Sequence, residues 1–272
     1  MEKKNIKIGI FGGGRGSAFY NSISANGGEI VAVCDYNEAC TKKARDRIGE
    51  GVALYTDFDE FIAHEGLEAV VLSNYFHEHA PYAIRALERG IHVLSECISN
   101  ATMAEGVELV RAAEKSTAIY MLAENYAYFA VTSKLTEIYQ SGTLGEALYC
   151  EGEYVHPMSH EEYVHYTPTT THWRALMPSG FYLSHSFAPL MRVTNDIPVS
   201  VNARSIYTDG MRQEREGEPI KDVASIMLCT MSRGAVARIT GWAKFGGHGN
   251  WYRFACAKGS AETVRGDEGK VR

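Results

Sequence analysis

The stretch Lys7–Asp35, KIGIFGGGRGSAFYNSISANGGEIVAVCD, decides the fold of this chain. An apolar run rich in β-branched residues over 6–11 predicts a strand buried on both faces. Glycines follow at once, at positions 12, 13, 14 and 16, and a helix can begin among them. A second apolar run over 30–34 ends in Asp35. The order of these elements predicts one βαβ unit with a dinucleotide-binding fingerprint.

Each position of this fingerprint has a physical role. Gly12 permits a tight turn, and Gly14 lets the backbone approach a pyrophosphate at the helix N-terminus. The third position falls on Ser17, which is small but is not glycine. Asp35 follows about 20 residues on, where a carboxylate can accept hydrogen bonds from ribose hydroxyls. Because an acidic side chain repels a 2′-phosphate, NAD is predicted rather than NADP. The alternative to a dinucleotide site is a glycine loop with a purely structural role.

Composition limits the partners. A length of 272 residues suits about two domains. The net charge of −6 provides no basic surface for nucleic acid or an anionic membrane. No apolar run approaches the ~18 residues of a membrane span. A cytoplasmic protein is therefore expected, with a small molecule as its partner and no metal.

The rest of the chain falls into two parts. Strands alternate with helices up to residue 124, which predicts an α/β Rossmann domain, a doubly wound parallel sheet over 1–124. Residues 125–272 predict an α+β domain with a largely antiparallel open sheet. Residues 157–178 lack clean periodicity, which is typical of functional segments. The sequence stops within what reads as an unfinished sheet, so we expect a C-terminally incomplete domain and a homo-oligomer, a dimer or tetramer, that covers it.

Several motifs together resemble the Gfo/Idh/MocA family of NAD(P)-dependent sugar oxidoreductases. They are the glycine loop with Asp35, residues 77–81 before 86–93, Glu96, and residues 141–146. The resemblance implies a Rossmann domain and an open sheet with a sugar bound between them. It implies a cofactor-binding set made of Gly12, Gly13, Gly14, Arg15, Gly16, Asp35, Asn74, His79, Glu96 and Asn125.

The sequence departs from the family's dehydrogenases in two places. A catalytic Glu-Lys-Pro triplet is replaced by Glu96-Cys97-Ile98, and a mostly neutral thiol cannot replace an ammonium. The usual Asp-x-x-x-His pattern is also absent. Residues 181–190, with 151–156 and 172–174, are instead similar to the NAD-dependent α-N-acetylgalactosaminidase branch. That branch also lacks the lysine and hydrolyses glycosides through a transient redox cycle.

The similarity to this branch implies that Tyr182, His185 and Tyr154 are catalytic. A separation of three would place Tyr182 and His185 on one face of a helix. Tyr154 and His156 would share one face of a strand. His185 suits proton shuttling at neutral pH, and Tyr154 or Tyr182 could be the base. Packing remains the alternative for each of these side chains.

Substrate-binding residues are expected close by, at His156, His172, Trp173 and Arg174. Five histidines (156, 160, 165, 172 and 185) within thirty residues raise the question of a zinc site. Their spacing matches no standard ligand pattern, so none is predicted.

The sequence therefore predicts an NAD-dependent enzyme that acts on a carbohydrate, with glycoside hydrolysis by transient hydride transfer as the leading reaction. A simple NAD-dependent sugar or polyol dehydrogenase is the first alternative. A non-catalytic NAD- or sugar-binding protein is the second, because the family lysine is missing.

Overall fold

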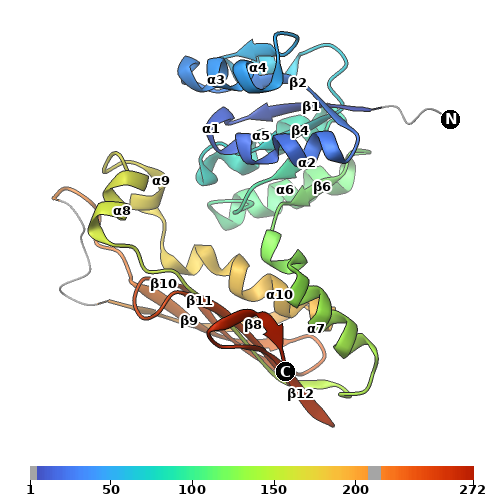
Figure 1. Ribbon diagram of the computed structural model, residues 1–272, viewed down its shortest axis with the longest axis vertical. Coiled ribbons are helices and arrows are strands. Elements are labelled where there is room, and N and C mark those ends of the chain that lie inside the picture. Colours follow the sequence, from blue (N-terminus) through green and yellow to red (C-terminus); the bar gives the residue numbers. More distant parts are fainter. Residues whose placement is uncertain (1–4, 208–215) are drawn as a thin grey trace. The chain divides into compact units, whose positions relative to one another are not determined.

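The first sheet is organised around strand β1 (Ile6–Phe11), the strand expected before the glycine loop. The structure is a computed structural model that describes residues 5–207 and 216–272. The chain divides into two units, residues 1–123 and 124–272, which are described separately below (Figure 1).

Unit 1 contains a six-stranded sheet in the order β3-β2-β1-β4-β5-β6, in which all neighbouring strands are parallel. The order runs outward in both directions from β1, so the carboxyl ends of β1 and β4 flank the point where dinucleotides bind in such sheets. Besides β1, its strands are β2 (Gly28–Cys34), β3 (Ala53–Tyr55), β4 (Ala69–Leu72), β5 (His92–Ser95) and β6 (Tyr120–Leu122).

Helices pack on both faces of this sheet. Neighbouring residues of β1 enter different cores, because Ile10 packs with Val33 and Val71 while Phe11 packs with Leu72 and Ala83. The predicted doubly wound sheet is therefore confirmed. The helical elements are α1 (Gly13–Gly16), η1 (Ser17–Phe19), α2 (Tyr20–Ala25), α3 (Glu38–Ile48), α4 (Phe58–Ile62), η2 (Phe76–Glu78), α5 (His79–Glu88) and α6 (Met103–Lys115).

Unit 2 contains a seven-stranded sheet in the order β13-β12-β11-β7-β10-β9-β8. Its strand pairs are antiparallel except for β7 and β10, which run parallel, so the mostly antiparallel second sheet is confirmed. The strands are β7 (Ala147–Val155), β8 (Pro198–Ile206), β9 (Ala224–Met231), β10 (Val236–Ala243), β11 (Gly249–Cys256), β12 (Gly259–Val264) and β13 (Asp267–Val271).

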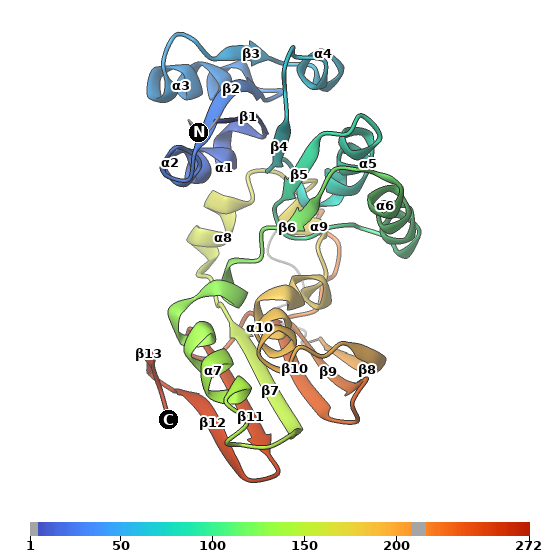
Figure 2. The ribbon, with the colours of Figure 1, turned by 90° about the vertical axis from the view of Figure 1, so that its right-hand side faces the viewer.

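Helices α7 (Ala130–Gln140) and α10 (Ser184–Thr194) cover one face of this second sheet (Figure 2). Their buried side chains, such as Leu135 and Leu190, pack against Ile239 and Phe254 of the strands. The shorter elements of unit 2 are η3 (Asn125–Tyr128), α8 (His160–Tyr166), α9 (Trp173–Leu176) and η4 (Ser179–Leu183). The segment 157–178, expected to be irregular, thus contains two short helices. Among the described residues, no helix has the length and apolar character needed to cross a bilayer.

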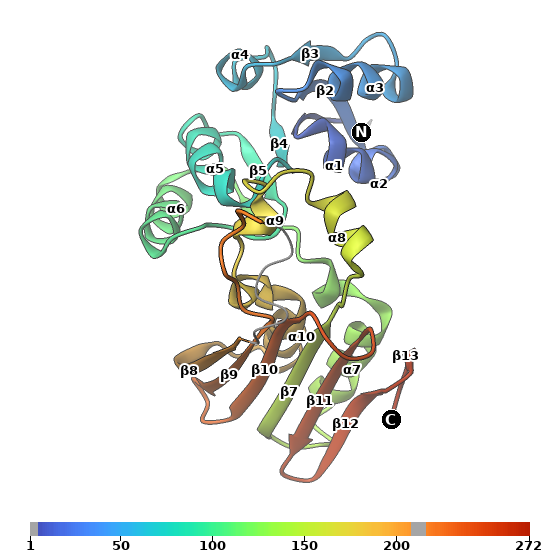
Figure 3. The ribbon, with the colours of Figure 1, turned by 90° about the vertical axis from the view of Figure 1, so that its left-hand side faces the viewer.

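The opposite face of the second sheet carries no helix in the described part of the chain (Figure 3). Residues alternate along a strand, so Glu151 and Glu153 point away from α10, which packs against Gly152. Arg238 lies 3.2 Å from Glu151 and 3.0 Å from Glu153, and Arg265 lies 2.8 Å from Glu153. The uncovered face therefore carries a network of ion pairs.

Candidate active site

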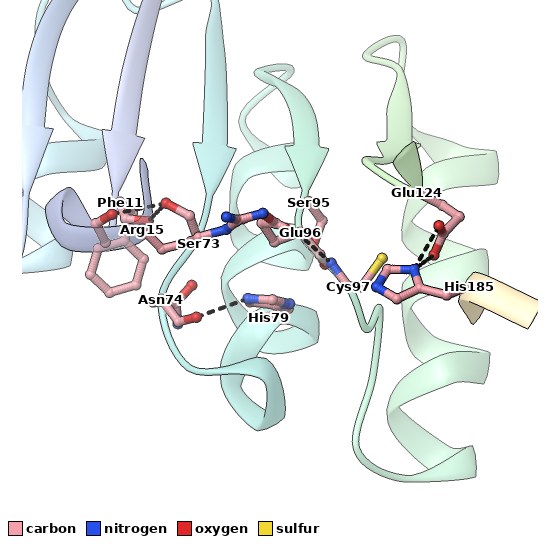
Figure 4. Close-up of polar contacts among 11 residues, drawn as sticks. Phe11, Arg15, Ser73, Asn74, His79, Ser95, Glu96, Cys97, Glu124 and His185 are labelled. Atoms are coloured by element: carbon pink, nitrogen blue, oxygen red, sulfur yellow. Dashed lines mark hydrogen bonds and ion pairs between the residues drawn. The ribbon is translucent and has the colours of Figure 1, made fainter. Parts of the chain in front are cut away.

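The glycine loop of unit 1 adopts a conformation that only glycine allows. Gly12 has a φ of 96°, and a Cβ built on it would lie 2.4 Å from the carbonyl carbon of Ser73. The hydroxyl of Ser73 donates to the carbonyl oxygens of Phe11 (3.0 Å) and Gly12 (2.9 Å), and Figure 4 shows this residue beside the end of β1. The turn is therefore fixed between the ends of β1 and β4.

Close packing of helix on strand occurs at Gly16 rather than at Ser17. A Cβ on Gly16 would lie 2.3 Å from Cγ2 of Ile10, so any side chain there would push the helix off β1. Gly14 is exposed, and only the Cys40 sulfur comes as near as 3.9 Å to its Cβ position. The backbone at Gly14 is thus open to a ligand, which is the arrangement a pyrophosphate requires.

Asp35 lies directly beside this loop. One carboxylate oxygen is 3.4 Å from the backbone nitrogen of Gly14, and the other accepts from the backbone N–H of Asn37 at 2.8 Å. Each carboxylate oxygen can accept more than one hydrogen bond, so the side chain retains capacity for ribose hydroxyls. The residues present therefore fit NAD at the position where the sequence predicted it.

Two other predicted cofactor residues pair with each other. Nε of Arg15 donates to Glu96 at 2.6 Å, and the second Glu96 oxygen accepts from the backbone N–H of Cys97 at 3.2 Å (Figure 4). Asn74 donates to Glu78 at 3.3 Å, but its buried Oδ1 has no hydrogen-bond partner. An orphaned acceptor at the carboxyl end of β4 is the kind of group that a bound ligand satisfies.

His79, also predicted to bind the cofactor, is engaged by the backbone. It is only 1% exposed, and its Nδ1 lies 2.7 Å from the carbonyl oxygen of Ile98 while Nε2 lies 3.2 Å from that of Asn74. Burial lowers the pKa of His79, although the hydrogen bonds of the ring with backbone carbonyls oppose this shift. The ring connects the segments that follow β4 and β5. Asn125, the remaining predicted cofactor residue, is exposed at the start of η3 in unit 2.

In unit 2, a buried carboxylate–imidazole pair forms between Glu124 and His185. The two oxygens of Glu124 lie 2.8 and 2.9 Å from Nδ1 of His185 (Figure 4), and the residues are 4% and 7% exposed. A carboxylate accepts but does not donate, so Nδ1 carries a proton, and in the neutral form of the ring Nε2 is the acceptor. Glu124 also accepts from the backbone N–H of Tyr126 at 3.0 Å, which fixes the carboxylate.

Two local features hold His185 in place. Pro189 lies inside α10 and has no N–H, so the carbonyl of His185 loses its helical partner. The hydroxyl of Tyr252 donates to that carbonyl at 2.7 Å instead. A Cβ on Gly152 would lie 2.0 Å from the carbonyl oxygen of Ser186, so the start of α10 rests directly on the backbone of β7.

Three tyrosine rings surround His185. Tyr126 stacks on the imidazole with ring centroids 4.1 Å apart, while Tyr154 and Tyr182 meet it edge-on at 4.9 and 4.8 Å. Tyr182 belongs to η4, with non-helical φ and ψ angles, and so precedes α10 instead of sharing a regular helix face with His185. The structure nevertheless brings Tyr154, Tyr182 and His185 together.

The environment distinguishes the chemical roles of these groups. Burial raises the pKa of Tyr154, and the nearby phenols of Tyr182 and Tyr126 raise it further. The phenol of Tyr154 is therefore protonated at neutral pH and can donate. His185, with Nε2 as an acceptor, is the group able to accept a proton.

Sequence reasoning missed Glu124, Tyr126 and Trp242. The pairing of β10 with β7 shifts register between Thr240 and Ala243, and Trp242 within this bulge has a φ of 22°. Its ring lies 5.6 Å from that of Tyr182. No local sequence pattern predicts these contacts. The only signals in the sequence are Glu124, an acidic residue where the alternation of strands and helices ends, and Gly241, a glycine directly before Trp242.

The predicted substrate residues occupy different places. The ring of His156 lies beside that of His248, with centroids 4.7 Å apart. The guanidinium of Arg174 lies over the ring of Trp173, 4.3 Å from its centroid. His172 caps α9, since its Nδ1 accepts from the backbone N–H of Arg174 at 3.3 Å. Of the histidines that raised the zinc question, those at 156, 160, 165 and 172 join no group of three possible metal ligands among the described residues.

The fold is shared with solved dehydrogenase structures. The structure matches WlbA dehydrogenase from Bordetella pertussis, solved with NADH and UDP-GlcNAcA, with a TM-score of 0.81, 17% identity, and coverage of 100% of this chain and 77% of that one. It matches myo-inositol 2-dehydrogenase from Lactobacillus plantarum with a TM-score of 0.76, 18% identity, and coverage of 95% and 76%. At these identities the likeness concerns the fold.

Sequence comparison agrees with the family that the motifs predicted. Residues 6–124 match the Gfo/Idh/MocA oxidoreductase family, NAD-binding Rossmann fold. A glycosyl hydrolase family 109 protein of Shewanella baltica is 27% identical over 203 residues, which cover 70% of this chain and 44% of that protein. An alpha-N-acetylgalactosaminidase of Shewanella oneidensis is 26% identical over the same extent. The chain thus spans less than half the length of these relatives.

Proposed function

We propose that this chain is an NAD-dependent, carbohydrate-active enzyme that hydrolyses a glycoside through transient oxidation of the sugar. The observation that carries the proposal is the buried Glu124–His185 pair enclosed by Tyr126, Tyr154 and Tyr182. It provides proton-transfer groups without the family lysine. The relatedness to glycosyl hydrolase family 109 proteins supports the same reaction.

The proposed cofactor is NAD rather than NADP. Support comes from Asp35, whose carboxylate lies beside Gly14, where it would accept from ribose hydroxyls and repel a 2′-phosphate. The exposed Gly14 backbone would receive the pyrophosphate, and the orphaned Oδ1 of Asn74 would accept from the ligand.

When bound, NAD+ would supply a reversible hydride acceptor for a sugar carbon bearing a hydroxyl. Nε2 of His185 takes the proton of that hydroxyl, while Glu124 stabilises the imidazolium that forms. Half-buried Tyr182, acting as its phenolate, removes the proton from the carbon next to the oxidised one. Protonated Tyr154 donates to the departing glycosidic oxygen. Water then adds to the resulting enone, with the Tyr154 phenolate taking a proton from the water and Tyr182 returning its proton to the carbon.

A simple sugar or polyol dehydrogenase is the second candidate, favoured by the dehydrogenases that share the fold. Chromogenic aryl glycosides, tested with and without NAD+, separate the reactions. Release of the aglycone that requires NAD+ but accumulates no NADH supports hydrolysis. Stoichiometric NADH with an intact glycoside indicates a dehydrogenase. If neither aglycone nor NADH is formed, the chain is a binding protein.

We also propose that the chain is cytoplasmic and forms a homo-oligomer through the uncovered face of the second sheet. Support for assembly comes from exposed apolar side chains on this face, such as Leu228 and Val236, beside the ion pairs of Arg238. Arg238→Glu should shift the mass measured by light scattering towards that of a monomer. An unchanged mass, or a monomeric parent protein, would contradict this interface.

A further inference from the structure

His156 presents a polar group that the folded chain does not satisfy. Its backbone is fixed, because its N–H donates to Ala243 at 2.9 Å and its carbonyl accepts from Nε1 of Trp242 at 3.2 Å. Its side-chain Nδ1, however, is buried and has no hydrogen-bond partner. The ring of His248, on the exposed loop that follows β10, meets it edge-on at 4.7 Å. Two imidazoles therefore converge beside Tyr154, whose ring lies 5.7 Å from that of His156.

Arg174 adds a permanent positive charge to this region. It is half-buried over Trp173, and its guanidinium forms no ion pair with any described residue. The burial of His156 lowers its pKa, and the charges of His248 and Arg174 lower it further. The charge of Arg174 also acts on Tyr154. We name His156, Arg174 and His248 the basic cluster.

The nearby carboxylates accept hydrogen bonds from other groups, although the charge of Glu162 also acts on His156. Glu124 is bound to His185 and to the N–H of Tyr126. Glu162 accepts from the backbone N–H of Ser159 in the capping box that begins α8. A metal cation would meet the guanidinium charge of Arg174, whereas an oxyanion would be attracted to it and could accept from the imidazoles.

We propose that the basic cluster binds an anionic group carried by the carbohydrate, either the carboxylate of a uronic acid or the phosphate of a sugar phosphate. The shared chemistry is an oxyanion that receives a planar pair of N–H donors from Arg174 and single donors from the imidazoles. The proposal deepens the proposed function and rests on it, since the cluster adjoins Tyr154.

The test is calorimetric titration of the full chain, saturated with NAD+, with galacturonate, glucuronate, galactose 6-phosphate, glucose 6-phosphate, and neutral galactose and glucose. At least one anionic sugar should bind about tenfold more tightly than its neutral counterpart, which is the scale of a charge-assisted hydrogen bond. The uronates and the phosphates form separate arms that identify which anion is preferred.

Arg174→Gln and His248→Gln should each reduce the preference for the anionic sugar several-fold and leave the affinity for NAD+ unchanged. The matched control is Arg111→Gln, which removes the same charge from an exposed position on α6 and should preserve the preference. Equal binding of anionic and neutral sugars, no binding of any anionic sugar, or a preference that survives both variants would overturn the proposal.

The proposed reaction is tested separately with neutral aryl glycosides. NAD-dependent cleavage without a preference for anionic sugars would support the proposed reaction and contradict the proposed role of the basic cluster. Selective binding of an anionic sugar without NAD-dependent chemistry on any glycoside would support the role of the basic cluster and contradict the proposed reaction.

Discussion

A single carboxylate, Glu124, determines which nitrogen of His185 carries the proton. Replacing it by Gln keeps an acceptor for Nδ1–H but removes the charge that stabilises the imidazolium. Glu124→Gln should therefore lower kcat by about 10²-fold and leave NAD binding unchanged. Steady-state kinetics with parallel NAD titrations measure both quantities. Glu114→Gln, at an exposed carboxylate on α6, is the control. An unaltered kcat in Glu124→Gln would remove this pair from the reaction.

Asp35 is the residue predicted to bind the ribose of the cofactor. Asp35→Ala removes a carboxylate that would accept from the ribose, so the affinity for NAD+ should fall by about 1–3 kcal/mol. Loss of its negative charge should also improve binding of NADP+ relative to NAD+. Calorimetry with both dinucleotides gives the two values, and equal NAD+ affinity in the variant and the parent would place Asp35 outside the site.

At the scale of elements, Gly152 lets α10 approach β7 and so brings His185 beside Tyr154. Gly152→Ala would place a methyl group 2.0 Å from the carbonyl oxygen of Ser186. The helix must shift, and we expect a loss of about 1–3 kcal/mol of stability together with lower activity. Thermal unfolding measures the first effect. Gly51→Ala, at an exposed turn with no atom within 4 Å, should leave the melting temperature unchanged or slightly raised.

The hydroxyl of Tyr252 supplies the hydrogen bond that the carbonyl of His185 lacks because of Pro189. Tyr252→Phe leaves the buried carbonyl of His185 without a partner and should cost about 1–2 kcal/mol. In a Pro189→Ala background the new N–H can donate to that carbonyl, so the same change should cost less. A double-mutant cycle of unfolding free energies measures the coupling, and strictly additive costs would show that the two groups act independently.

Elements were predictable where their signal is local. The β1 strand, the glycine turn and Asp35 lie within thirty residues of one another, so neighbouring residues are enough to predict them. The segment 157–178 contains α8 and α9, each short and mainly defined by its cap, and periodicity cannot identify helices of four to seven residues.

At the scale of the whole molecule, the geometry of the candidate site depends on contacts between distant positions. Glu124 and His185 are 61 residues apart, and no spacing rule pairs them. The tyrosines around His185 were predicted only in part, through family resemblance, since a sequence pattern does not show which rings converge. The orphaned Nδ1 of His156 depends on the loop carrying His248, which only the folded sheet brings near.

The ion-pair network on the uncovered sheet face predicts a response to acid. Burial opposes ionisation of Glu153, but Arg265 and Arg238 outweigh it, so its pKa lies below the ordinary value of 4.5. This carboxylate therefore stabilises the fold above pH 4.5, and the contribution is lost as pH falls through the lowered pKa. Urea unfolding from pH 7 to pH 3 should show a stability difference between the parent and Glu153→Gln that shrinks below about pH 4.5. A pH-independent difference would contradict this assignment.

The bulge at Trp242 restricts how the chain can vary in length. Side chains alternate between the two faces of a sheet, and the extra residue between Thr240 and Ala243 resets that alternation just before the loop bearing His248. Deleting one residue here would restore a regular ladder with β7 and turn the following side chains to the opposite face. Trp242 would leave the ring of Tyr182, and the loop to β11 would start from the wrong side. Over these few positions, insertions and deletions are less tolerable than substitutions.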